Sequence, residues 1–195
     1  KNETAFEPEL GGHKYASELL KQVVDLNAGI YLDDELKGTH KTEFCIGVAG
    51  YPEKHFEAPN LYTDLQYLKA KVDAGADYII TQMFFDNKKY FAFVDACKAA
   101  GINVPIIPGL KPIYTKKQLT ILPKTFSIEL PTDLSNEVLK CKSDEEVEKV
   151  GAAWLLQQSK ELKEYGVPVL HYYTLGRPVL IADVVNAGVV LTCIR

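Results

Sequence analysis

Polar and aromatic side chains follow three apolar runs of the sequence. The run CIGVAG leads into Tyr51 and His55, the run YIIT into Gln82, and the run VPVLHYY into Arg177. A side-chain amide both donates and accepts hydrogen bonds, aromatic rings offer flat apolar walls, and arginine holds anions through two parallel bonds. Together with Lys71 as a second cation, this set suits a flat heterocycle with an amide-like edge and an anionic end, such as a pterin or a flavin.

The same residues also have ordinary structural roles, which the sequence leaves open. Gln82 in a buried strand can satisfy a neighbouring backbone group, and His171 in an apolar strand is typical of a hydrogen-bonded core histidine. The phenylalanines after Met83 suit a core, His55 suits a solvated loop, and Asp86 suits the N-cap of a helix. Taken together on one predicted face, these residues favour a site.

The sequence shows no pattern for a metal site or a serine triad. Its four histidines are scattered, without an H-x-x-x-H pair. No C-x-x-C pair occurs, so we expect reduced structural thiols without a catalytic role at the four cysteines, which are Cys45, Cys97, Cys141 and Cys193. The apolar patterns around Cys45 and Cys97 predict that these two are buried.

Hydrophobic periodicity predicts that strands and helices alternate along the chain. The predicted strands are 44–49, 78–85, 104–109, 126–130 and 167–174. The predicted helices are 15–26, 61–74, 88–100, 116–122, 144–165 and a last one that begins near Pro178. Asn60 is expected to cap the second helix, and Ser143 with Glu146 to cap the long one. This order indicates an α/β fold with a parallel sheet.

Two architectures fit the order of elements: an open doubly wound sheet and a (β/α)8 barrel. Neither a G-x-G-x-x-G nor a G-x-x-x-x-G-K-[ST] motif occurs, which weakens the open nucleotide-binding sheet. In a barrel, the active site lies at the carboxyl ends of the strands, which is where the polar groups gather. The length suits a single domain over residues 1–195.

Composition narrows the classes of partner. The formal net charge is -4, with 25% charged residues, whereas a protein that grips nucleic acid needs a basic face. No apolar run approaches the roughly 20 residues of a membrane span. The N-terminal stretch KNETAFEPELGG lacks the apolar region of a signal peptide. We therefore expect a cytoplasmic protein without a nucleic-acid or membrane partner.

Four motifs appear in a fixed order: GYPEKHFEA, KVDAGADYIITQMFFD, PIIPGLKPI and LHYYTLGR. In this order the chain resembles the methylenetetrahydrofolate reductase family. The resemblance implies a (β/α)8 TIM barrel, of which this chain supplies about the last five strands. It also implies bound FAD, which takes hydride from NADH or NADPH and passes it to 5,10-methylenetetrahydrofolate. The product, 5-methyltetrahydrofolate, belongs to one-carbon metabolism and methionine supply.

The resemblance assigns roles residue by residue. The residues expected to hold FAD are Tyr15, Ala16, Tyr51, His55, Glu57, Ala58, Asp64 and Lys71. The residues expected to hold folate or the nicotinamide are Gln82, Tyr90, Gln118, Leu122 and Arg177. The sequence departs from the family pattern at Phe56, where proline is common, and in TLGRP, which replaces TLNR before the expected folate contact.

The resemblance implies that the first strands of the family barrel lie outside the 195 residues, together with the glutamate expected to act as general acid. The resemblance therefore implies that this chain alone does not reduce folate. The alternative is a non-catalytic remnant or subunit that binds flavin or pterin. Another pterin-handling barrel, such as a methyltransferase, would need no flavin and fits the FAD-like motifs poorly. The preference for NADH or NADPH and the oligomeric state stay open, although we expect self-association.

Overall fold

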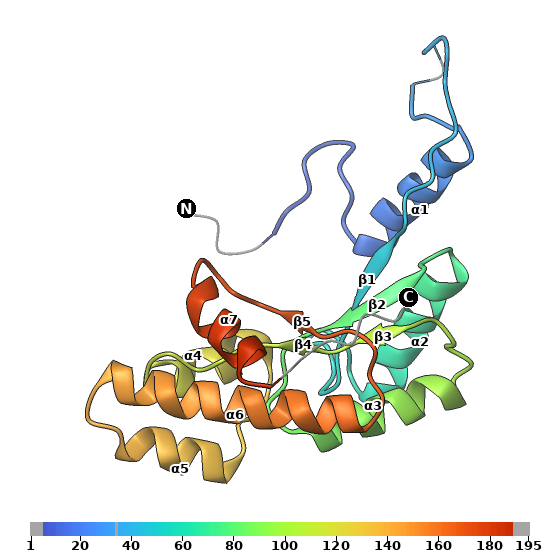
Figure 1. Cartoon of the computed structure of the whole chain (residues 1–195). Coiled ribbons are helices and arrows are strands. Elements are labelled where there is room, and N and C mark those ends of the chain that lie inside the picture. The colour runs from blue at the N-terminus through green and yellow to red at the C-terminus, as the bar shows by residue number, and fades with distance from the viewer. Residues whose placement is uncertain (1–5, 34, 189–195) are drawn as a thin grey trace.

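The structure is a computed structural model that describes residues 6–33 and 35–188. These residues form seven helices and five short strands (Figure 1). The helices are α1 (Ala16–Asn27), α2 (Leu61–Asp73), α3 (Asn87–Ala99), α4 (Gln118–Phe126), α5 (Thr132–Lys140), α6 (Asp144–Glu164) and α7 (Pro178–Asn186). The strands are β1 (Gly47–Gly50), β2 (Tyr78–Thr81), β3 (Ile106–Ile107), β4 (Gly109–Leu110) and β5 (His171–Tyr172). The predicted α/β class is confirmed.

All strand pairs are parallel, as predicted. Strand β2 lies between β1 and β3, and β4 pairs with β5. Strands β3 and β4 are separated by Pro108 alone, which has no N–H for a ladder bond. The predicted strand 104–109 is therefore split into two pieces, the first bonded to β2 and the second to β5. This split connects the two small sheets through one segment of chain.

Helices α2 and α3 cover one face of β1–β3. Leu68 of α2 and Phe93 of α3 pack with Ile79 of β2 in a buried cluster. Full burial of each such side chain contributes roughly 1.5–3 kcal/mol. On β1, however, Gly47 and Ala49 are exposed. In Figure 1, α3 and α6 lie below the strands, while α1 extends away above them.

A second cluster joins α6 and α7 to the other strands. It brings together Phe84, Leu110 of β4, Leu155 of α6 and Ile181 of α7, all of which are buried. The described residues contain no helix that is suited to span a membrane.

Helix α5 was not predicted from the sequence. Leu134 and Val138, one helical turn apart, are fully buried with Val147 of α6. The i, i+4 spacing of these two residues after Pro131 is the signal that marks an amphipathic helix. Helix α5 packs directly on α6, and their shared cluster includes Met83 and covers the carboxyl end of β2.

The predicted strand 126–130 is wrong. Phe126 is the last residue of α4, and Ser127 takes a left-handed conformation with φ +54°. Ile128 is buried against the cluster of α4, α5 and α6, so the apolar alternation records packing and not strand pairing. The predicted strand has no place between β4 and β5, because these two strands pair directly with each other.

The predicted burial of the first strand is also wrong in part. The strand begins at Gly47, later than the predicted residue 44. Phe44 is 54% exposed and Cys45 is exposed, whereas Cys97 is fully buried as predicted. Burial raises the pKa of the Cys97 thiol to about 12, which suits a structural thiol. The prediction for Cys193 lies outside the described residues.

The predicted helix starts are largely confirmed. Asn60 Oδ1 accepts the Thr63 N–H at 2.9 Å at the start of α2. At the start of α6, Ser143 Oγ accepts the Glu146 N–H at 3.3 Å. Asp86 accepts the Lys88 N–H at 2.9 Å, so its role as an N-cap is confirmed. Each cap satisfies a backbone donor that the first helical turn leaves free.

Three residues connect the carboxyl ends of β2 and β5 through the start of β4. The Gly109 N–H donates to Thr81 Oγ1 at 2.9 Å, and the Tyr173 hydroxyl donates to the Thr81 carbonyl at 2.9 Å. A Cβ atom on Gly109 would overlap the Thr81 carbonyl oxygen and crowd the Tyr173 ring. We call Thr81, Gly109 and Tyr173 the strand junction.

Replacement of Tyr173 by Phe is expected to lower the free energy of unfolding by about 1 kcal/mol, because the Thr81 carbonyl loses its hydroxyl donor. Urea unfolding measures this change. The matched control is Tyr165→Phe, since Tyr165 is 46% exposed and its hydroxyl makes no hydrogen bond within the described residues. An equal effect of both substitutions would contradict the role given to the strand junction.

Candidate functional site

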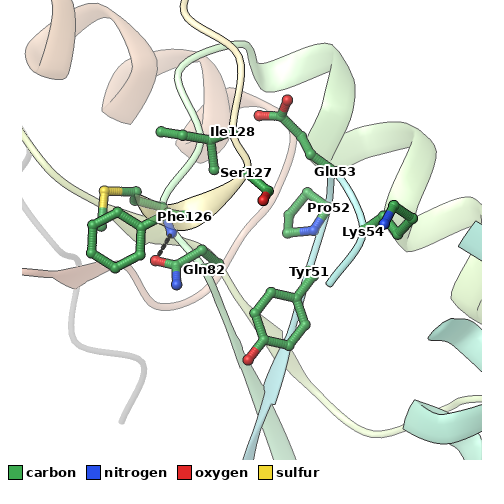
Figure 2. A pocket seen from close by; sticks show the side chains of 9 residues that line it. Tyr51, Pro52, Glu53, Lys54, Gln82, Phe126, Ser127 and Ile128 are labelled. Carbon is green, nitrogen blue, oxygen red and sulfur yellow. Dashed lines mark hydrogen bonds between the residues drawn. The ribbon is translucent and has the colours of Figure 1, made fainter. Parts of the chain in front are cut away.

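The carboxyl ends of β1 and β2 meet at a small pocket. The Gln82 N–H donates to the Gly50 carbonyl at 2.8 Å, which continues the strand register and sets Tyr51 beside Gln82. The residues lining the pocket come from the two strand ends and from the segment after α4; they are Tyr51, Pro52, Glu53, Lys54, Gln82, Met83, Phe126, Ser127 and Ile128 (Figure 2). The structure thus brings the polar groups of the first two strands together.

The loop after β1 is fixed by Lys54. This residue has a φ of +85°, and its Nζ donates to the carbonyls of His55 at 2.9 Å and Ala58 at 2.7 Å. The His55 N–H donates to the carboxylate of Asp64, on α2, at 2.8 Å. Asp64 is buried, so this bond ties the loop to a fixed point. The loop therefore has one defined path over the end of β1.

This path sets the His55 ring against Tyr51, with ring centroids 4.5 Å apart in an edge-on arrangement. The Glu57 N–H donates to His55 Nδ1 at 3.3 Å, which leaves Nε2 to carry the proton of the neutral ring. Burial, and then the charge of Asp64, raises the pKa of Tyr51. The tyrosine is therefore a neutral, half-buried ring at physiological pH.

Lys71, on α2, reaches the backbone of β1. Its Nζ donates to the Ala49 carbonyl at 2.9 Å. Burial lowers the pKa of this ammonium, and the nearby charge of Asp64 opposes that shift. Because an ammonium has three donors, Lys71 retains N–H groups for an anion.

Gln82 bends back on its own strand. Its Oε1 accepts the Met83 N–H at 2.9 Å, a bond drawn as the dashed line at Gln82 in Figure 2. The Nε2 group has no hydrogen-bond partner within the described residues, which leaves two donors beside the pocket. Gln82 therefore satisfies a backbone N–H, which is the structural role that the sequence left open, and it also keeps two donors that are unpaired within the described residues.

Glu53 is a pocket residue to which the sequence assigned no role. It is the one carboxyl among the described residues that line this pocket, and its side chain is only 7% exposed. Burial raises its pKa, against the lowering effects of the Glu129 N–H and Lys89. The Glu129 N–H donates to its Oε2 at 2.9 Å, so Glu53 anchors the segment after α4 over the pocket.

Three other predicted folate and nicotinamide contacts do not line the pocket. Tyr90 is 2% exposed, and its hydroxyl donates to the Ile106 carbonyl at 2.7 Å. Leu122 is buried in the cluster over the strand ends. Gln118 Oε1 accepts the Tyr114 N–H at 2.6 Å at the start of α4. The ligand roles of these three residues stay predictions.

Tyr15 and Ala16 lie at the start of α1, and both are exposed. The Tyr15 ring has Lys14 Nζ 5.2 Å from its centre. Within the described residues, no hydrogen bond, ion pair or ring contact joins Tyr15 to the pocket. Their expected place along FAD therefore stays a prediction as well.

A second polar group lies after β4 and β5, where the sequence pointed only to Arg177. Lys111 is 2% exposed, and its Nζ lies 4.8 Å from the centre of the Tyr114 ring. The guanidinium carbon of Arg177 lies 5.1 Å from the same ring centre, and its Nη1 contacts the Glu148 carboxylate at 2.8 Å. We call Lys111, Tyr114 and Arg177 the basic cluster.

The Lys111 ammonium is buried and forms no ion pair among the described residues. Burial, and secondarily the charge of Arg177, lowers the pKa of Lys111 from 10.5 to about 8. Its one hydrogen bond within the described residues goes to the Pro112 carbonyl at 3.1 Å.

In the described ranges, no group of three or more His, Cys, Asp or Glu is arranged to hold a metal ion.

Replacement of Lys111 by Met is expected to stabilise the fold at pH 7 by on the order of 1–3 kcal/mol, because a buried charge is removed while its apolar stem is kept. A base whose folded-state pKa is depressed binds fewer protons folded than unfolded between about pH 8 and 10.5. The gain should thus be full below pH 8 and disappear towards pH 10.5.

Thermal unfolding of both proteins from pH 6.5 to 10.5 measures this effect, on an interval set by the two pKa values of Lys111. The control is Lys117→Met, the same charge change at an exposed residue of the same segment. A Lys111→Met protein that is less stable at pH 7 would show that the ammonium supports the fold.

Comparison with known proteins gives a consistent family. A family profile described as methylenetetrahydrofolate reductase matches residues 1–188. The 5,10-methylenetetrahydrofolate reductase of Salmonella typhimurium is 43% identical over 136 residues, covering 69% of this chain and 46% of that protein. The methylenetetrahydrofolate reductase (NADH) 1 of Arabidopsis thaliana is 38% identical over 155 residues, covering 74% of this chain and 26% of that protein.

A solved structure is also similar over part of the chain. It is an uncharacterised protein from Clostridium thermocellum described as binding two copies of 5-methyl-5,6,7,8-tetrahydrofolic acid, and it is 21% identical. The match covers 72% of this chain and 50% of that one with a TM-score of 0.46, which is too low to establish a shared fold.

The chain spans between 22% and 46% of the length of the curated relatives that it matches. The family match over residues 1–188 includes every residue of the pocket and of the basic cluster. The chain belongs to the methylenetetrahydrofolate reductase family.

Proposed function

We propose that this chain carries the flavin- and folate-binding residues of an oxidoreductase that converts 5,10-methylenetetrahydrofolate to 5-methyltetrahydrofolate, with NADH or NADPH as hydride donor. The observation that carries the proposal is the pocket at the joined ends of β1 and β2. There a neutral aromatic ring, Tyr51, lies with a free amide edge, Gln82, in a chain of this family. The name of the Arabidopsis relative supports the nicotinamide donor.

The residues around β1 fit FAD in their chemistry. Lys71 and His55 offer hydrogen-bond donors for a diphosphate, and Tyr51 offers a flat ring. Gly47 and Ala49 are exposed on β1, so no long side chain blocks that face of the strand. FAD bound there would supply the hydride chemistry, and the protein's part would be to hold and orient the reactants.

Each predicted folate or nicotinamide residue has a specific task in this proposal. The Gln82 amide would bind the edge of the pterin, and Arg177 would hold the anionic end of folate. Gln118 and Leu122 would border the space used in turn by folate and the nicotinamide. Tyr90 would act indirectly, because its hydroxyl is engaged with the Ile106 carbonyl.

The general acid is proposed to come from outside the 195 residues. Glu53 is the one carboxyl among the described residues that line the pocket. Its Oε2 already accepts the Glu129 N–H. That engagement also supports the second candidate function, a flavin- or pterin-binding unit that does not turn over by itself. The two candidates predict the same ligands and differ in redox chemistry.

We further propose that the strands form part of a (β/α)8 barrel. Strands β3 and β4 act as one strand interrupted by Pro108, with β2 on one side and β5 on the other. The strands therefore fill four consecutive parallel positions, one fewer than the five proposed from the sequence. Four positions are half of the eight in such a barrel.

Purified chain is expected to take up FAD, and Lys71→Met is expected to weaken the uptake by about tenfold, because a charge-assisted bond to the diphosphate is lost. Flavin fluorescence during titration measures the affinity. The matched control is Lys69→Met. Lys69 lies on the same helix, and its ion pair with Asp73 is exposed. Anaerobic NADH should then reduce the flavin absorbance at about 450 nm if the reductive half-reaction is present.

The outcomes separate the candidates. Uptake and bleaching support the reductase, whereas uptake without bleaching supports the non-catalytic unit. A chain that takes up no FAD, or a Lys69→Met protein that loses it equally, contradicts the FAD site described above.

Replacement of Gln82 by Leu is expected to weaken the binding of 5-methyltetrahydrofolate by about tenfold or more, because a polar ligand edge would lose its partner. Isothermal titration calorimetry with that folate measures the change. Gln66→Leu, at an exposed position of α2, is the control and should bind like the parent chain. Equal affinity of all three proteins would remove Gln82 from the site.

A further inference from the structure

We infer that the basic cluster of Lys111, Tyr114 and Arg177 is a binding site for an oxyanion, namely a carboxylate or phosphate group of a small-molecule ligand. No role was assigned to Lys111 or Tyr114 by the family resemblance. The inference rests on the proposed function for Arg177, which that proposal places at the anionic end of folate, and it adds Lys111 and Tyr114 to the same site. Binding is measured without turnover.

The first argument is an unbalanced buried charge. Lys111 is 2% exposed, and a lysine is almost never fully buried unless it is paired. Its two neighbours, the Pro112 carbonyl and the Tyr114 ring, are both neutral. Within the described residues, no carboxylate lies within ion-pair distance of its Nζ.

The second argument is that a second cation faces the same ring. The Arg177 guanidinium lies 5.1 Å from the Tyr114 ring centre, compared with 4.8 Å for Lys111 Nζ. A single aromatic face stabilises a cation by about 0.5–2 kcal/mol, which does not offset the burial of one charge next to another. An oxyanion near both groups would turn their repulsion into two charge-assisted hydrogen bonds.

The third argument concerns access from the pocket side of the strands. Leu110 packs into the cluster of α3, α6 and α7, and successive residues of a strand point to opposite faces. Lys111 therefore extends away from these helices. The strand direction places it at the same carboxyl ends that carry Gln82 and Tyr173.

Arg177 is the movable part of the basic cluster. Its side chain is 58% exposed, and its ion-pair partner Glu148 is 38% exposed, so this ion pair contributes about 1 kcal/mol or less. Leu175 and Gly176, just before it, both have positive φ and form a turn. Arg177 can therefore exchange the Glu148 carboxylate for a ligand anion at little cost in free energy.

A structural role and a binding role for Lys111 give opposite expectations. A structural ammonium would make the Met variant less stable. An ammonium kept for binding makes that variant at least as stable, while the variant loses affinity for the anion. Stability exchanged for function in this way is common at binding sites.

The test uses the purified chain and two probes, p-aminobenzoylglutamate as the carboxylate source and 5′-AMP as the phosphate source. Calorimetry or amide chemical shifts report binding. At least one probe should bind the parent chain with a Kd of about 1 mM, and Lys111→Met should weaken that binding by about tenfold or more. Lys117→Met, the matched charge change at an exposed lysine, should bind like the parent chain.

The probe that binds identifies the source of the anion, a folate-like carboxylate or a nucleotide phosphate. The inference is overturned if neither probe binds, if Lys111→Met binds as tightly as the parent chain, or if this variant fails to fold. FAD uptake by Lys111→Met is measured in parallel. Unchanged FAD uptake with lost anion binding supports the basic cluster alone, and lost FAD uptake in the parent chain concerns only the proposed function.

Discussion

The close approach of Gly109 to Thr81 is the constraint on which the rest of the structure depends. With no side chain on Gly109, its backbone reaches the Thr81 hydroxyl, and the Tyr173 hydroxyl reaches the Thr81 carbonyl from the next strand. Any Cβ atom at Gly109 would occupy the space of the Thr81 carbonyl oxygen. Pro108 breaks the ladder just before this point, so the strand junction replaces the missing ladder bonds and holds β2 and β5 together through one segment.

The positions of the pocket and of the basic cluster depend on the strand junction. One residue beyond β2 is Gln82, one beyond β4 is Lys111, and one beyond β5 is Tyr173. Because the strands are parallel, their carboxyl ends deliver these residues to one side of the sheet. The loops then determine the detail, since Lys54 and Asp64 fix the path over β1.

The cost of this arrangement lies in ionisable groups that are held out of water. Glu53 and Lys111 both have pKa values moved by burial in the direction that disfavours their charged forms. Glu53 is compensated by the Glu129 N–H, and it anchors the segment after α4. Lys111 has one hydrogen bond, to the Pro112 carbonyl, and no carboxylate within ion-pair distance among the described residues. Buried charges of this kind are typical of binding and catalytic sites.

Local patterns in the sequence were enough for most of the elements. Apolar spacing located most of the helices to within a few residues. Asn60 and Asp86 marked the starts of α2 and α3, because a cap depends on atoms only two or three residues apart. The gathering of polar groups at strand ends was also predictable, since it follows from parallel order alone. The motifs at Tyr51, Gln82 and Arg177 carried the family resemblance for the same reason: they are contiguous in the chain.

Tertiary contacts decided the remainder. The alternation at residues 126–130 looks like a strand, yet β5 already holds the position beside β4, and Ile128 instead packs on helices. Cys45 lies in an apolar run, but its burial depends on neighbours that the run does not specify. Lys111 reads as a surface residue by its type. Only the fold, by setting Tyr114 and Arg177 around it, makes it a buried cation, because burial is a property of what packs against a residue and not of the residue itself.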